Sequence, residues 1–186
     1  MSRCKRRSQD SIYETNCKVS VTKGNIAQRL YDYGPEFYVE FKVRILEHPT
    51  AHWNSILAVT KSDDNWGRFP AVWFHKNRFF HFSTTDTESY NFDGVKLHHE
   101  YNIVISQQYN SKRELINSII INDQVVRSIV NTKPRSINQA LVYLSHPTEA
   151  SFNDTGEVSA VTVIPGKFHV EIIKLCWKNL CWFLHT

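Results

Sequence analysis

The sequence predicts an all-β protein, a two-sheet antiparallel β-sandwich, on two observations. First, Phe37–Ile45 alternates strictly, with apolar residues at odd positions and Tyr, Glu, Lys or Arg at even ones. A period of two places one strand face on a core and the other in water, as is typical of antiparallel sheets. Second, about ten short apolar runs follow one another between polar turns, with no convincing helix before residue 165, which indicates a sandwich, jelly roll or barrel.

Length and composition suit one globular domain. The 186 residues are 41% hydrophobic and 13% aromatic, which is enough for one sizeable core and too apolar for a disordered chain. We expect an irregular N-terminal arm over residues 1–18, the sandwich over 19–164, and a C-terminal extension over 165–186.

The charge pattern favours neither a nucleic-acid partner nor a membrane span. The formal net charge is only +4, and its basic excess gathers in Arg3, Lys5, Arg6 and Arg7, which we interpret as a solvated tail; contact with nucleic acid or an anionic surface is the alternative. No later stretch interleaves basic and aromatic residues as a nucleic-acid groove does. No run approaches the roughly 20 apolar residues of a transmembrane helix, so we expect no membrane span.

The strands of the first half are predicted from apolar runs and from the turns that separate them. Gly34-Pro35 starts the alternating strand, and Asn77 marks a tight turn between two later ones. Trp53 and Trp73 are expected in the core. The predicted strands are Val19–Thr22, Phe37–Ile45, Ser55–Thr60, Phe69–His75 and Arg78–Ser83, with polar loops at Lys61–Gly67 and Thr84–Gly94.

The second half continues the same pattern. Two β-branched runs flank Asn122-Asp123-Gln124 and predict a hairpin. The predicted strands are Tyr101–Ser106, Ile116–Ile121, Val125–Val130, Leu141–Ser145 and Val158–Ile164.

The segment after Pro165-Gly166 fits more than one structure. Phe168 and Ile172 follow a strand period with Val170, whereas Val170 and Trp177 also fit a helical one. A strand that pairs with the N-terminal strand is favoured. An amphipathic helix on the sandwich and membrane contact through the C-terminal aromatics are the alternatives.

Four cysteines, Cys4, Cys17, Cys176 and Cys181, lie at the two ends of the chain. Their even number predicts two disulfides with three possible pairings, and free buried thiols are the alternative. No Cys-x-x-Cys pair or nearby His pair completes a tetrahedral metal site. The cysteines and the Asn153 glycosylation sequon favour a secreted protein. The charged N-terminus lacks the apolar stretch of a signal peptide, so the chain would be a mature form or a fragment.

The order and spacing of four segments are more specific than any one of them. The segments are Phe37–Ile45 with Trp53–Leu57, Asp63–Phe74, Ile119–Val126, and Val130–Arg135 with Val142–Pro147. In this order they resemble laminin-G-like and concanavalin A-like lectin domains of animal extracellular proteins. The resemblance implies a jelly-roll sandwich and an extracellular binding role.

The chain departs from that family pattern at two places. Such domains usually have Gly-Asp-Arg where this chain has Trp66-Gly67-Arg68, and Asp-Pro-Trp where it has His146-Pro147-Thr148. An Asp is therefore missing at both positions.

The best candidate ligand site is the polar loop that carries Trp66. An aromatic ring can stack on the C–H face of a sugar while Asn65 and Arg68 bind its hydroxyls; the alternative is that Trp66 caps the sandwich. Asp63 and Asp64 are candidate calcium ligands, although a plain turn is the favoured interpretation. Tyr90, in the second polar loop, is a further candidate for the ligand site.

These residues predict a non-catalytic recognition module that binds a glycan or an extracellular glycoprotein, without a required cofactor. The alternative is a protein-interaction or structural module that uses the exposed face of Tyr38, Glu40, Lys42 and Arg44. A carbohydrate-active enzyme is disfavoured. Its carboxylate pair would be Glu36 and Glu40, and Glu40 shares its face with two basic residues.

Overall fold

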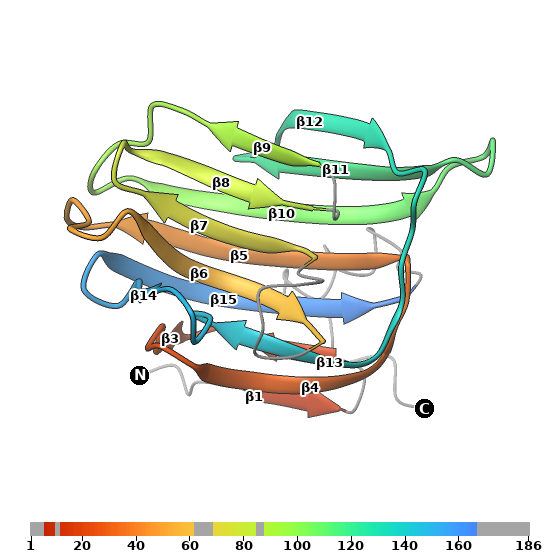
Figure 1. Cartoon of the computed structure of the whole chain (residues 1–186), viewed down its shortest axis with the longest axis horizontal. Coiled ribbons are helices and arrows are strands. Elements are labelled where there is room, and N and C mark those ends of the chain that lie inside the picture. Colours follow the sequence, from red (N-terminus) through yellow and green to blue (C-terminus); the bar gives the residue numbers. More distant parts are fainter. Residues whose placement is uncertain (1–5, 10–11, 62–68, 85–87, 167–186) are drawn as a thin grey trace.

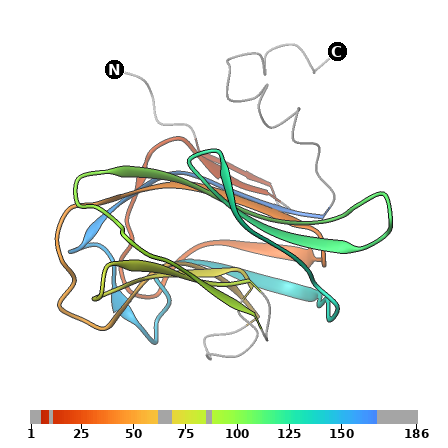
Figure 2. The same cartoon turned by 90° about the horizontal axis from the view of Figure 1, so that it is seen from above.

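The protein is described from a computed structural model over residues 6–9, 12–61, 69–84 and 88–166. Within these residues there are fifteen strands and no helix, so the predicted all-β class is confirmed. The strands form two sheets that lie as two layers (Figures 1 and 2).

Sheet A has the strand order β1-β2-β15-β5-β10-β11-β12, and β3 also pairs with β15. Every pair in sheet A is antiparallel. Its strands are β1 (Arg6–Gln9), β2 (Ile12–Thr15), β3 (Lys18–Val19), β5 (Phe37–Ile45), β10 (Glu100–Tyr109), β11 (Leu115–Ile121), β12 (Gln124–Val130) and β15 (Gly156–Pro165).

Sheet B has the order β4-β13-β6-β7-β8-β9. It is antiparallel apart from the short β14, which lies parallel to β6. Its strands are β4 (Asn25–Tyr33), β6 (Trp53–Thr60), β7 (Ala71–His75), β8 (Phe79–Ser83), β9 (Ser89–Phe92), β13 (Ile137–Leu144) and β14 (Ala150–Ser151).

The core lies between the two sheets, and the alternation of β5 fills its centre. The odd positions of β5 are fully buried, as the sequence predicts. On sheet B, Phe74, Phe80 and Phe82 face the same core. Burying one such side chain stabilises the fold by about 1.5–3 kcal/mol, so this shared inner face holds the two layers together.

The N-terminal segment differs from the predicted irregular arm. Three short strands, β1, β2 and β3, continue sheet A beyond β15. Arg6–Gln9 is wholly polar and shows no apolar period. Its pairing arises from backbone hydrogen bonds along a sheet edge, which leave no signature in side-chain hydrophobicity.

Strand β4 was missed because its period is broken twice. The buried residues Ala27, Leu30 and Tyr33 are three apart, not two. The register shifts opposite Val142/Tyr143, where β4 carries a bulge, and Asp32 has a positive φ of 54°. A bulge inserts one residue and reverses the faces beyond it. Similarly, the predicted Thr84–Gly94 loop contains β9.

The predictions for the C-terminal extension lie largely outside the described residues. Strand β15 ends at Pro165, and residues 167–186 are not described, so the strand and helix interpretations stay predictions. Within the described ranges, no helix is long and apolar enough to cross a membrane.

Candidate functional site

The predicted ligand loop cannot be placed. Residues 62–68 are not described, so the proposed roles of Trp66, Asn65, Arg68, Asp63 and Asp64 stay predictions. Elsewhere in the described ranges, no group of three or more His, Cys, Asp or Glu side chains could hold a metal ion.

Tyr90 lies on β9, the edge strand of sheet B, and contacts β12, the edge strand of sheet A. Its ring packs against the core, with its centroid 6.3 Å from that of Phe82. The Arg127 guanidinium lies 5.7 Å from the Tyr90 ring centroid and pairs with Glu88 at 3.2 Å. These contacts close the edge of the sandwich, while the predicted ligand role of Tyr90 stays untested.

The other predicted sites are only partly described. Asn153 is exposed just after β14, where a sequon is accessible, and its glycosylation stays a prediction. Cys17 is half-buried and is not a free thiol. Cys4, Cys176 and Cys181 lie outside the described residues, so none of the three pairings is tested.

The outer face of sheet A is the surface that the sequence predicts to be exposed along β5. Tyr38 corrects that prediction, because it is only 6% exposed and packs against Val104 and Ile164 of the neighbouring strands. The Tyr38 hydroxyl donates to Glu40 Oε2 at 2.5 Å. Burial and the adjacent Glu40 carboxylate raise the Tyr38 pKa well above its ordinary value.

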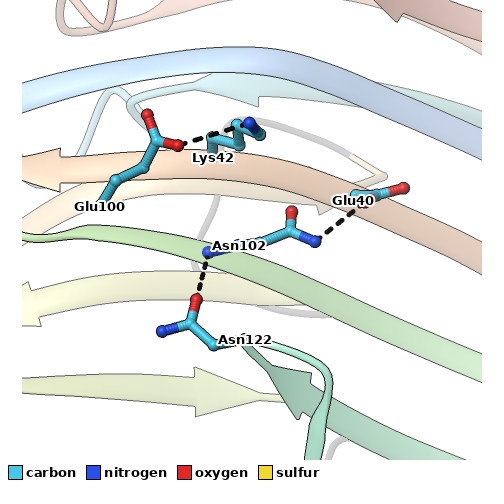
Figure 3. Close-up of polar contacts among 5 residues, drawn as sticks. All are labelled: Glu40, Lys42, Glu100, Asn102 and Asn122. Atoms are coloured by element: carbon cyan, nitrogen blue, oxygen red, sulfur yellow. Dashed lines mark hydrogen bonds and ion pairs between the residues drawn. The ribbon is translucent and has the colours of Figure 1, made fainter. Parts of the chain in front are cut away.

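Several polar groups of this face bond to one another (Figure 3). Asn102 Nδ2 donates to Glu40 Oε1 at 3.2 Å, and the Lys42 ammonium lies 3.4 Å from Glu100. Asn122 Oδ1 accepts from the Asn102 backbone N–H at 2.8 Å. Charges that are already paired contribute little to capturing a ligand, because the resident pair has to be broken first.

The outer face of sheet B carries aromatic and histidine side chains in two neighbouring rows. Strand register places Trp53 opposite His75, and His75 opposite Phe79. The next row pairs Trp73 with His81. Because residues directly opposite in a ladder share a face, we define the aromatic–histidine patch as Trp53, Trp73, His75, Phe79 and His81.

Trp53 is the most exposed member of the patch. Its side chain is 38% exposed, which corrects the prediction that Trp53 is a core residue. Its ring centroid lies 4.4 Å from that of His75 and 5.2 Å from that of His81. His75 in turn stacks on Phe79 at 4.4 Å. The ring of Trp53 is thus held by packing while part of it remains accessible.

Trp73 is buried, as predicted, but away from the central core. It belongs to a separate cluster with Ala58, Ala71, Leu141 and Tyr143 on the outer side of sheet B. Its ring centroid lies 5.5 Å from that of His81.

Hydrogen bonds assign the accepting nitrogen in two of the three histidines near Trp53. His52 Nε2 lies 2.8 Å from the Lys76 ammonium, which can only donate, so this nitrogen accepts. His75 Nδ1 accepts from the Asn77 backbone N–H at 3.1 Å, so its ring proton is on Nε2. Both rings therefore keep one N–H donor each.

His81 differs from the other two histidines. Its Nδ1 lies 2.6 Å from Asn91 Oδ1, a carbonyl oxygen that can only accept, so Nδ1 carries the proton.

His75 has a lowered pKa. Burial is the largest cause, followed by the nearby basic groups of His52, Lys76 and His81. All the charged groups that shift it are basic, so the surroundings of the patch favour negative charge over positive charge.

Taken together, the patch offers a partly exposed indole beside histidine N–H groups. Apolar C–H faces with hydroxyl acceptors, as on sugars, are the chemistry that such a surface complements. Sequence reasoning missed the patch because its residues come from separate strands. The available signal was the i, i+2 spacing of Trp73 with His75 and of Phe79 with His81, which places each pair on one strand face.

Comparison with known proteins relates the chain to others by fold. No protein family and no curated protein matches its sequence. Trypanosoma rangeli sialidase in complex with sialic acid superposes with a TM-score of 0.57 and 15% identity, covering 94% of this chain and 32% of the sialidase. The botulinum neurotoxin serotype G binding domain superposes with a TM-score of 0.57 and 14% identity, covering 95% of this chain and 46% of that domain.

A third structure matches over most of its own length. The endo-β-1,4-glucuronan lyase of the fungus Trichoderma reesei has a TM-score of 0.50 and 11% identity, covering 88% of this chain and 87% of the lyase. By contrast, the chain spans less than half of the sialidase and toxin structures that it matches. At these identities the likeness concerns the fold alone, and the chain shares the jelly-roll-like β-sandwich of these proteins.

Proposed function

We propose that this chain is a non-catalytic, extracellular recognition module that binds a glycan or glycoprotein, with the aromatic–histidine patch as its binding surface. The observation that carries the proposal is the partly exposed Trp53, held between His75 and His81. A rigid aromatic side chain with neighbouring polar hydrogens binds at a low cost in conformational entropy.

Two further observations support a carbohydrate ligand and a laminin-G-like relationship. The fold neighbours include a sialidase crystallised with sialic acid and a glucuronan lyase, and both of those proteins act on carbohydrates by name. The segment order described above adds a sequence resemblance to lectin-like extracellular domains. Fold alone does not determine function, so the argument depends on the patch.

The absence of catalysis is part of the proposal. Of the two candidate acids, Glu36 accepts from the Tyr109 backbone N–H at 3.3 Å, and Glu40 accepts from Tyr38 and Asn102. Both carboxylates are therefore already engaged by groups of the protein itself, which disfavours them as a catalytic pair.

The test is glycan-array binding of the wild type and of Trp53→Ala. We expect Trp53→Ala to lose about 5- to 150-fold in affinity, since stacking on an aromatic ring is worth about 1–3 kcal/mol in related recognition. Tyr31→Ala is the matched control, because Tyr31 is 50% exposed on β4, away from the patch. Equal binding by the wild type and Trp53→Ala would refute the patch as the binding surface.

The same array separates the patch from the undescribed loop. Trp66→Ala and a calcium chelator test the sequence-predicted roles of Trp66 and of Asp63 and Asp64. No glycan binding under any of these conditions would favour the alternative function, a protein-interaction module.

A further inference from the structure

We propose that the aromatic–histidine patch selects saccharides that carry an anionic group, a carboxylate or a sulfate. This inference rests on the proposed function, since it names the ligand class of the same surface. It is argued from the polar hydrogens and charges around Trp53.

The polar groups beside Trp53 are mostly donors. With His52 Nε2 and His75 Nδ1 already accepting, each of these rings keeps an N–H. The Lys76 ammonium has three hydrogens, and its contact with His52 uses one of them. An anionic oxygen accepts several hydrogen bonds and binds charged donors more strongly than a neutral hydroxyl does.

The charge around the patch is also one-sided. The groups that act on His75 are His52, Lys76 and His81, all of them basic. Within the described part of the chain, Lys76 has no carboxylate partner, whereas Lys42 on sheet A is paired with Glu100. An anion at the patch would gain Coulomb attraction without first displacing a resident acid.

The surroundings of His81 contain no acid either. Its Nδ1–H donates to Asn91 Oδ1 at 2.6 Å. Around it lie Trp53 of β6, Trp73 and His75 of β7, and Asn91 of β9, and no acid is among these neighbours.

The experiment compares three polysaccharide probes by titration calorimetry at low salt: neutral dextran, polygalacturonate and dextran sulfate. The variants are Trp53→Ala, Lys76→Gln and Lys112→Gln. Lys112 is an exposed lysine in the β10–β11 turn, so its substitution controls for the general basic charge of the protein. Circular dichroism checks that each variant is folded.

We expect at least one acidic probe to bind more tightly than dextran. Lys76→Gln should weaken that binding by about five- to tenfold, and Lys112→Gln by less than about twofold, since one charge-assisted contact is lost only in the first. The carboxylate and sulfate probes distinguish which anionic group is preferred.

Three results would overturn the inference. Equal losses in Lys76→Gln and Lys112→Gln would mean non-specific charge attraction. Binding of dextran equal to that of the acidic probes, and lost in Trp53→Ala, would refute anion selection while leaving the proposed function intact. Binding of every probe unchanged in Trp53→Ala, or no binding of the acidic probes together with no Trp53-dependent signal on the array, would refute both.

Discussion

The outer faces of the two sheets differ in whether their charged side chains have partners of opposite charge. On sheet A, two pairs connect β5 and β10: Glu40 bonds to Asn102, and Lys42 forms an ion pair with Glu100. On sheet B, the patch around Trp53 gathers aromatic rings and basic groups whose charges have no acidic counterpart among them. The hydrogen bonds and ion pairs on the outer face of sheet A stabilise the sandwich. The outer face of sheet B, with its available N–H donors and partly exposed Trp53 ring, is suited to recognition.

The largest expected effect is the loss of stability in Tyr38→Ala, compared with that in Trp53→Ala. Tyr38→Ala should lower the free energy of unfolding by about 3 kcal/mol, because it removes a buried aromatic ring. Trp53→Ala should lower it by less than about 1.5 kcal/mol, because Trp53 is already partly exposed. Urea unfolding measures both, and glycan affinity should show the reverse order. A larger stability loss in Trp53→Ala would break the comparison.

A second prediction concerns alkaline conditions and sheet A. The Tyr38 pKa is raised above its ordinary value of 10.0. As pH rises above about 10, Tyr38 ionises first in the unfolded chain, so its contribution to stability is full below that pH and is lost above it. Tyr38→Phe should therefore reduce the fall in stability between pH 9 and 11, measured by urea midpoints. Part of the fall in stability should remain in Tyr38→Phe, because burial also raises the pKa of Tyr33.

The third prediction concerns acidic conditions and sheet B. The His75 pKa is lowered from its ordinary value of 6.5. As pH falls, the unfolded chain takes up the proton first, so the contribution of His75 is full above about pH 6.5 and is lost below it. His75→Phe keeps an aromatic ring and should show a shallower loss of stability from pH 7 to 5. Identical slopes in the two proteins would contradict the burial of a neutral His75.

The smallest effect is expected for the surface ion pair on sheet A. Lys42→Gln removes the contact with Glu100, in which both side chains are more than a third exposed. Such pairs are worth about 0–1 kcal/mol. Unfolding should therefore change by less than about 1 kcal/mol, and binding of an acidic probe by less than about twofold. A loss as large as that of Lys76→Gln would move the recognition surface to sheet A.

Much of the fold could be predicted from local patterns. The bounds of β5 follow from its own alternation, and the β11–β12 hairpin from two β-branched runs around Asn122-Asp123. Strand β4 could not be found in this way, because a bulge and the left-handed Asp32 reverse its faces. Strand β1 could not be found either, because its pairing depends on a sheet edge formed by distant residues.

The candidate site was less predictable than the fold. The sequence pointed to the loop around Trp66 and to Tyr90 in a second polar loop, where aromatic and polar residues are adjacent in the chain. The patch on sheet B instead joins residues from β6, β7 and β8, and its members become neighbours only through strand register.

By itself, the sequence determined that the protein is a β-sandwich, since a period of two marks which residues of a strand share a face. Only the tertiary structure decided which outward-facing residues are covered. Tyr38, predicted to be exposed, is buried beside Val104 and Ile164, while Trp53, predicted to be core, stands partly exposed beside His75. The physical reason is that exposure depends on cross-strand neighbours, and those neighbours come from distant parts of the chain.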